Sequence, residues 1–188
     1  MSNAERILSV LDTGLDHPVQ LVIYGRAALA LGFDDPPAAT KFSLDVDVII
    51  PLSMVGLMRT DTGFWDAQEN ANRLLEPEGL YITHLFGADQ VFLRADWEKH
   101  LVPITRPATR WLRLFRPATL DLILTKMMRG DDPQDMADVD FLVRHDRVRA
   151  DQIEAALAAV VLPDLAELQD AFAQAKPRVR ELTRRAGF

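Results

Sequence analysis

Two aspartates one residue apart are the residues of this sequence whose type and spacing best suit chemistry. They lie in residues 43–50 (SLDVDVII), a stretch otherwise as apolar as a buried β-strand. Because successive side chains of a strand alternate between faces, Asp45 and Asp47 are predicted to share one face, and Val46 and Val48 the other. Neighbouring carboxylates repel each other, so a compensating group is expected beside the pair.

Carboxylates at this spacing form an oxygen-rich platform that suits Mg²⁺, an ion bound by carboxylates together with waters and phosphate oxygens. A site that bridges two such ions stabilises both the attacking and the leaving oxygen of an in-line displacement at phosphorus. A third carboxylate usually completes such a site. The alternative is that Asp45 and Asp47 only line the solvent face of a half-exposed strand.

Hydrophobic periodicity and turn residues predict the elements that position the pair. In the first half we expect helices at residues 4–12, 26–31 and 64–75, strands at 21–24 and 44–50, and a hairpin formed by 80–86 and 90–93. The second half is predicted to be helical at 118–129, 133–145, 151–161 and 164–184, with a break before Pro177 as an alternative in the last helix.

The order of these elements predicts an α/β (α+β) fold with a small mixed β-sheet flanked by helices over residues 1–115 and a helical C-terminal subdomain over residues 116–188. The length of 188 residues suits either one domain or one domain with a small appendage. The chain has no cysteine, which excludes disulfides, thiolate metal sites and a cysteine nucleophile. It has no apolar run of the roughly 18 residues that a membrane helix needs, so a cytoplasmic location without membrane contact is expected.

The net charge of −7 argues against a protein that coats nucleic acid non-specifically. Two segments are nevertheless basic. Arg106, Arg110, Arg113 and Arg116 surround Trp111 and Phe115, and Lys176, Arg178, Arg180, Arg184 and Arg185 lie near the end of the chain. These cations are either solvated surface charges or parts of a face that binds RNA or a nucleotide.

The segment from the first strand to the aspartate pair resembles the nucleotidyltransferase superfamily with the polymerase-β-like fold. The signature of that superfamily is a hydrophobic residue, a glycine turn, a helix, and then two aspartates one residue apart on a strand. The corresponding residues are Tyr24-Gly25-Arg26 and Asp45-Val46-Asp47. The resemblance implies that the glycine turn lets the backbone approach a triphosphate, whose charge also suits the N-terminus of the helix that follows.

Further residues are similar to the abortive-infection and toxin–antitoxin nucleotidyltransferases and their uncharacterised relatives. Their pattern of a basic residue, a hydroxyl residue and the first aspartate corresponds to Lys41-Phe-Ser43-Leu-Asp45. Their downstream lysine and D-x-x-D helix correspond to Lys126 and to Asp135-Met-Ala-Asp138. For Lys126 two structural alternatives stay open: a stem that carries its ammonium to water, or an ion pair with one of these two acids.

The sequence departs from the family pattern in the glycine turn and in the third acid. Arg26 replaces the second small residue of the turn, where its side chain either crowds the phosphate site or binds the phosphate. The strand expected to carry the third carboxylate has none, and His84 is interpreted there as a surface or core histidine. Asp96 is the preferred replacement, with Asp89 next.

The resemblance implies Mg²⁺-dependent transfer of a nucleoside monophosphate from an NTP to a hydroxyl of RNA, protein or a small molecule. Asp45 and Asp47 hold the metal and activate the acceptor in this hypothesis, with Asp96 as a third metal ligand. Gly25, Arg26, Lys41 and Ser43 contact the nucleotide, and Lys126 contributes to catalysis. Two further hypotheses are a catalytically degenerate member that binds a nucleotide or a partner, and a toxin–antitoxin component that depends on a partner chain.

Overall fold

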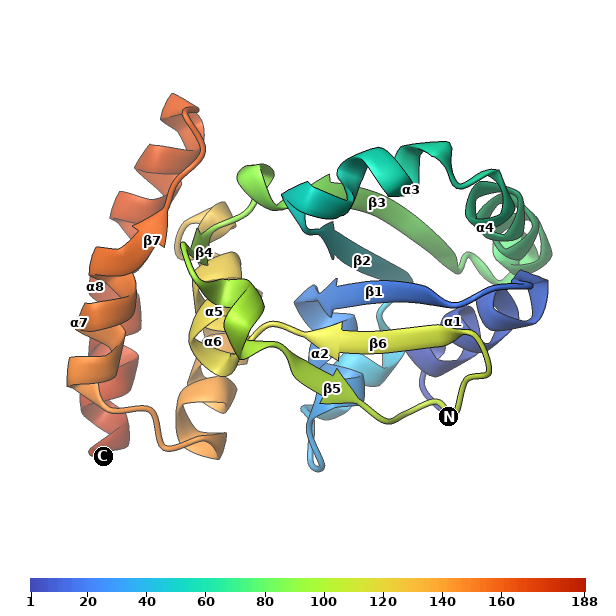
Figure 1. Cartoon of the computed structure of the whole chain (residues 1–188). Helices are drawn as coiled ribbons and strands as arrows, with labels where there is room; N and C mark the ends of the chain where they lie inside the picture. The colour runs from blue at the N-terminus through green and yellow to red at the C-terminus, as the bar shows by residue number, and fades with distance from the viewer. The chain divides into compact units, whose positions relative to one another are not determined.

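The computed structural model describes the backbone of all 188 residues and every side chain except those of Thr83 and His84, so the prediction for His84 lies outside the described side chains. The mixed α and β class is confirmed (Figure 1). The chain divides into two compact units, Met1–Gly87 with Leu101–Arg116 and Ala88–His100 with Pro117–Phe188. The second unit thus includes residues 88–100, which precede the boundary expected after residue 115.

The first unit is built on a five-stranded mixed sheet with the strand order β3-β2-β1-β6-β5. Its strands are β1 (Val19–Tyr24), β2 (Asp45–Ile50), β3 (Tyr81–Gly87), β5 (Val102–Ile104) and β6 (Leu112–Arg116). Strand β1 pairs antiparallel with β2 and parallel with β6, β2 pairs parallel with β3, and β5 pairs antiparallel with β6. The strand with the two aspartates therefore lies next to the strand that ends at the glycine turn.

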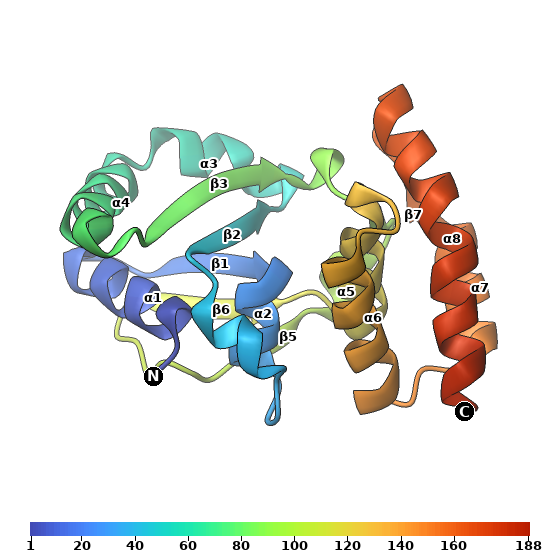
Figure 2. The ribbon, with the colours of Figure 1, turned by 180° about the vertical axis from the view of Figure 1, so that it is seen from behind.

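Four helices belong to the first unit: α1 (Asn3–Gly14), α2 (Gly25–Gly32), α3 (Val55–Thr60) and α4 (Thr62–Leu75). Helices α1 and α2 lie behind the strands in Figure 1 and in front of them in Figure 2, so both cover the same side of the sheet. Both helices contact β2, whose Val46 and Val48 are almost completely buried. Because side chains alternate along a strand, this leaves Asp45 and Asp47 on the opposite side of β2.

The expected hairpin of residues 80–86 and 90–93 is wrong. Strand β3 pairs with β2 instead, and the residues after it form a 3₁₀ turn, Ala88–Gln90. Strand β4 (Leu93–Arg94) pairs with β7 (Val160–Val161) in a separate two-stranded sheet of the second unit. The strand expected at 80–86 is present, but of the strand expected at 90–93 only Leu93 belongs to a strand. The partner of each strand depends on tertiary contacts that a local pattern does not contain.

Helices dominate the second unit. They are α5 (Thr119–Thr125), α6 (Pro133–His145), α7 (Ala150–Ala159) and α8 (Ala166–Ala186). The predicted helix 118–129 ends as a 3₁₀ turn at Lys126–Arg129, and α8 continues through Pro177 without a break. The rings of Phe92 and Phe172 meet edge to face at 5.6 Å in the core of this unit. In the part of the chain that the structure describes, no helix is both long enough and apolar enough to cross a membrane.

Candidate functional site

The two aspartates share one face of β2, as their spacing predicts. Asp45 and Asp47 are half-buried, whereas Val46 and Val48 between and after them are almost completely buried. In the antiparallel register of β1 and β2, Tyr24 lies opposite Asp47. Residues that face each other across a ladder point to the same side of the sheet, so Tyr24 shares the face of the carboxylates.

The glycine turn lies against Asp47. Gly25 has a φ of +64°, a left-handed conformation that costs a residue with a side chain about 1–2 kcal/mol. A Cβ built at Gly25 would be 3.5 Å from Oδ2 of Asp47. The backbone that leads into α2 is therefore beside the carboxylate, and the glycine at this turn satisfies the left-handed backbone angle.

Tyr24 is a member of the site whose role the sequence did not reveal. Burial raises the pKa of its phenol strongly, and the negative charges of Asp47 and then Asp45 raise it further. The raised pKa keeps the phenol neutral near pH 7, so its O–H is able to donate a hydrogen bond there. Its ring packs edge to face on Phe86 of β3, with the centroids 5.9 Å apart. Its position directly before Gly25 is the signal by which it could have been found.

Of the residues predicted to contact the nucleotide, Ser43 makes a direct bond to the pair. Its hydroxyl donates a hydrogen bond to Oδ1 of Asp45 at 3.0 Å, which orients that carboxylate. Lys41 is exposed on the preceding 3₁₀ turn, Ala38–Phe42, and Arg26 is half-buried in the first turn of α2. The structure thus brings together Gly25, Ser43 and the two aspartates. Arg26 lies in the helix that follows the glycine turn, and Lys41 in the 3₁₀ turn that precedes β2.

No third acid joins Asp45 and Asp47 from β3, since that strand contains none. Among the side chains that the structure describes, no three histidine, aspartate or glutamate residues are grouped as metal ligands. Asp96 belongs to the second unit, where Nε2 of His100 lies 3.1 Å from its Oδ2. This hydrogen bond lowers the pKa of Asp96.

Lys126 is also part of the second unit, and its ammonium is enclosed by acids. Its Nζ lies 3.0 Å from Oδ1 of Asp135 and 2.6 Å from Oδ2 of Asp138, and all three residues are buried. Arg129 adds a hydrogen bond of 2.6 Å from Nε to the other oxygen of Asp135. The ion pair that was open as an alternative is therefore present, and it satisfies charges that would be costly to bury alone.

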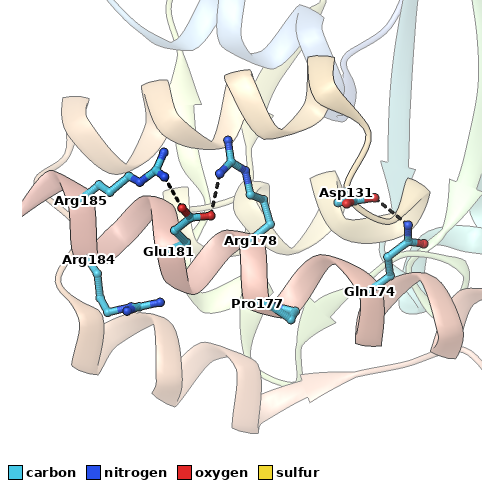
Figure 3. A pocket seen from close by; sticks show the side chains of 7 residues that line it. All are labelled: Asp131, Gln174, Pro177, Arg178, Glu181, Arg184 and Arg185. Atoms are coloured by element: carbon cyan, nitrogen blue, oxygen red, sulfur yellow. Dashed lines mark hydrogen bonds and ion pairs between the residues drawn. The ribbon is translucent and has the colours of Figure 1, made fainter.

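The basic segment at the end of the chain lies on α8 and is largely neutralised within its own unit (Figure 3). Arg178 and Arg185 both bind the carboxylate of Glu181, and Arg180 forms a two-point contact with Glu154 at 2.7 Å. Beside them is a surface hollow of about 650 Å³, across which Gln174 donates to Asp131 at 2.6 Å. Most cations of this segment thus have a carboxylate partner.

The oxygen atoms around Asp45 and Asp47 suit a magnesium ion, because two carboxylates on one face leave further coordination positions for water and phosphate. Protein-family models, curated proteins and solved structures give no match to this chain. The functional argument therefore depends on the residues and the geometry of β1, β2 and the turn between β1 and α2.

Proposed function

We propose that the chain is a nucleotidyltransferase that depends on Mg²⁺ and transfers a nucleoside monophosphate from an NTP to a hydroxyl acceptor. The observation that carries this proposal is the position of Asp47 beside the left-handed turn at Gly25, on the same face as Asp45. A turn without a side chain gives phosphate oxygens access to backbone N–H groups at the start of α2. The two carboxylates then lie where a triphosphate and its cation would be bound.

In the reaction, the acceptor hydroxyl oxygen forms a bond to the α-phosphorus of the NTP, and the bond from that phosphorus to the bridging oxygen breaks, releasing pyrophosphate. The hydroxyl proton passes to a carboxylate of the pair and from there to water. Bound Mg²⁺ supplies neutralisation of the phosphate charge. The chain contributes mainly position and electrostatics, as is usual in phosphoryl-type transfer.

Each surrounding residue has a defined part in this proposal. Ser43 holds Asp45 in one orientation through the bond to its Oδ1. Tyr24 is a neutral donor beside the two negative charges. Lys41 and Arg26, from the elements on either side, offset the charge of the triphosphate. Lys126 has a structural role in this proposal, because its ammonium forms buried ion pairs with two aspartates. Asp96 has no part in it, since its carboxylate is paired with His100.

The proposal is tested by incubating the purified chain with Mg²⁺, each α-³²P-labelled NTP in turn, and a set of RNA, protein and small-molecule acceptors. We expect a labelled product that is lost, by at least about 100-fold in rate, in Asp45→Asn and Asp47→Asn. Asp66→Asn is the matched control, because Asp66 is an exposed acid on α4 of the same unit. Equal labelling by the Asp47→Asn and wild-type chains would contradict the proposal.

A second candidate function is nucleotide binding without transfer, and the lack of an acid on β3 favours it. Calorimetry with Mg²⁺ and each NTP separates the two candidates: binding without any labelled product supports the degenerate form. Growth of cells that express the chain alone tests the further idea of a toxin, since a toxin slows growth unless its partner is present.

A further inference from the structure

The last helix of the second unit, α8, carries opposite charges at its two ends. Residues 164–175 contain three acids and no base, and residues 176–188 contain five bases and one acid, Glu181. Glu181 and Glu154 of α7 bind arginines of α8 and so neutralise part of the basic end. Two acids do not balance five bases, so α8 is negative where it begins and positive where it ends.

Two of these charges lie on one exposed stripe of the helix. Asp170, Pro177 and Arg184 are spaced by seven residues, about two turns, so they follow a single line along α8. All three are exposed, whereas Phe172 and Val179 on the other side of the helix are buried. Pro177 and Arg184 also line the surface hollow of about 650 Å³ (Figure 3). The acid and the cation are thus at equal distances from Pro177 on an exposed face.

Two apolar side chains at the ends of α8 are placed in the same symmetric way. Leu165, the N-cap residue, is 59% exposed, and Phe188, which follows the glycine at the C-cap, is 47% exposed. Leu165 lies 12 positions before Pro177, and Phe188 lies 11 positions after it. Each end of the helix therefore has an apolar side chain outside the core next to a charged stretch of one sign.

We propose that a second copy of this chain binds along α8, with the two helices antiparallel and crossing at Pro177. A two-fold axis at the crossing brings Asp170 of each chain opposite the partner's Arg184, and Leu165 beside the partner's Phe188. The same surface of both chains forms such an interface, so each contact occurs twice. The inference does not depend on the proposed nucleotidyl transfer.

The charges also select the orientation of the two helices. A parallel pair would place the acidic ends together and the basic ends together, and like charges repel. The antiparallel pair places each acidic end on a basic end. Ala173, a small exposed residue one turn before Pro177, lets the two helix axes approach to about 8–10 Å at the crossing.

Sedimentation velocity of the full chain, from about 5 to about 200 µM, measures the association. One pair of helices with many polar contacts forms a small interface, so we expect a dimer with a dissociation constant of about 10–100 µM. The dimer should weaken as salt is added, because the facing charges are exposed.

Charge reversal tests the facing of Asp170 and Arg184. Asp170→Arg and Arg184→Asp each replace two attractive contacts per dimer by two repulsive ones, and each should raise the dissociation constant at least about tenfold. An equal mixture of the two variants should form a heterodimer with nearly wild-type affinity, because both contacts again join opposite charges. A chain that carries both substitutions should form a homodimer for the same reason.

The matched control is Arg149→Asp, which makes the same charge change at an exposed arginine before α7 in the same unit. It should dimerise within twofold of wild type, and circular dichroism should show that every variant is folded. A wild-type chain that is monomeric at about 200 µM would overturn the inference. An equal loss in Arg149→Asp, or a mixture of the two reversed variants that associates no more than each variant alone, would overturn it as well.

Discussion

The carboxylate of Asp47 lies against the turn at Gly25, with its Oδ2 3.5 Å from the position that a Cβ would occupy there. This relationship joins two segments that are 22 positions apart in the sequence through the antiparallel pairing of β1 with β2. A methyl group at this position is not excluded by space, since 3.5 Å is an ordinary van der Waals separation. The constraint comes from the φ of +64°, and under the proposed function an open turn also leaves room for a phosphate.

Replacing Gly25 by alanine should therefore have two separable effects. The left-handed backbone should lower the free energy of unfolding by about 1–2 kcal/mol, measured by urea denaturation. The methyl group beside Asp47 should also weaken the binding of an NTP with Mg²⁺ at least fivefold, measured by calorimetry.

Gly79→Ala is the matched control for the backbone effect. Gly79 has a φ of +68°, close to that of Gly25, but nothing lies within 4 Å of the position that a Cβ would occupy at Gly79. The control should lose similar stability and keep the nucleotide affinity of the wild-type chain. Unchanged nucleotide affinity in Gly25→Ala would show that the turn is not a phosphate site.

The sequence predicts the parts of the site that depend on local order. Alternation along residues 44–50 placed Asp45 and Asp47 on one face, and the glycine after Tyr24 marked the end of β1 correctly. These features depend on chain geometry and on the conformational freedom of glycine, both of which are visible in a short window.

Strand pairing and buried ion pairs could not be derived in this way. The run Leu112–Arg116 alternates in burial like a strand, yet its arginines drew attention to charge and concealed the period of two. The partner of β3 and the choice of Lys126 between water and acid depend on residues distant in sequence. Such contacts are decided by the packing of the whole unit, for which one sequence gives no direct signal.

Asp12 is predicted to stabilise the loop before β6, because it accepts three backbone hydrogen bonds. Asp12→Ala leaves these N–H groups without their acceptor and should lower the free energy of unfolding by about 2 kcal/mol. Burial acts to raise the pKa of Asp12, but the hydrogen bonds from Arg110, Leu112 and Trp111 outweigh it and lower the pKa below 3.8.

The pH dependence of this contribution has a definite sign. A carboxyl whose pKa is lowered by folding stabilises the protein above its unfolded value, here near 3.8, and the contribution is lost as the pH falls through the folded pKa. Urea denaturation between pH 5 and pH 3 should therefore show a smaller loss of stability in Asp12→Asn than in the wild-type chain. Identical pH profiles would refute this role for Asp12.

His17 is predicted to make the first unit more stable at acidic pH. Its Nδ1 lies 2.7 Å from Asp16 and its Nε2 2.8 Å from Asp61, and these hydrogen bonds raise the pKa of His17 above 6.5. The contribution is complete below pH 6.5 and is lost as the pH rises through the folded pKa. Because the imidazole is partly exposed, we expect about 0.5 kcal/mol, the size of a surface ion pair.

The measurement for His17 compares unfolding at pH 5.5 and pH 8.5 in the wild-type chain and in His17→Gln. The variant should lose the extra stability of the acidic condition, and Asp16→Asn should lose part of it, since Asp61 remains as a partner. If the free energy of unfolding differs between pH 5.5 and pH 8.5 by the same amount in the wild-type chain and in His17→Gln, the hydrogen bonds of His17 contribute nothing to the pH dependence.

Lys126 gives the sharpest distinction between a structural and a catalytic lysine. Its Nζ contacts Asp135 and Asp138 in a buried environment, so Lys126→Met leaves two buried acids without their cation and should cost about 3–5 kcal/mol. Lys99→Met, at an exposed lysine of the same unit, should change stability by less than about 0.5 kcal/mol.

A double-mutant cycle of Lys126→Met with Asp138→Asn tests the contact directly. The stability losses of the two single variants should sum to at least about 1 kcal/mol more than the loss in the double variant, because residues in contact are coupled. A Lys126→Met chain that unfolds like wild type but transfers no nucleotide would instead assign the ammonium to the reaction, because an ion pair that holds α6 cannot be removed without a loss of stability.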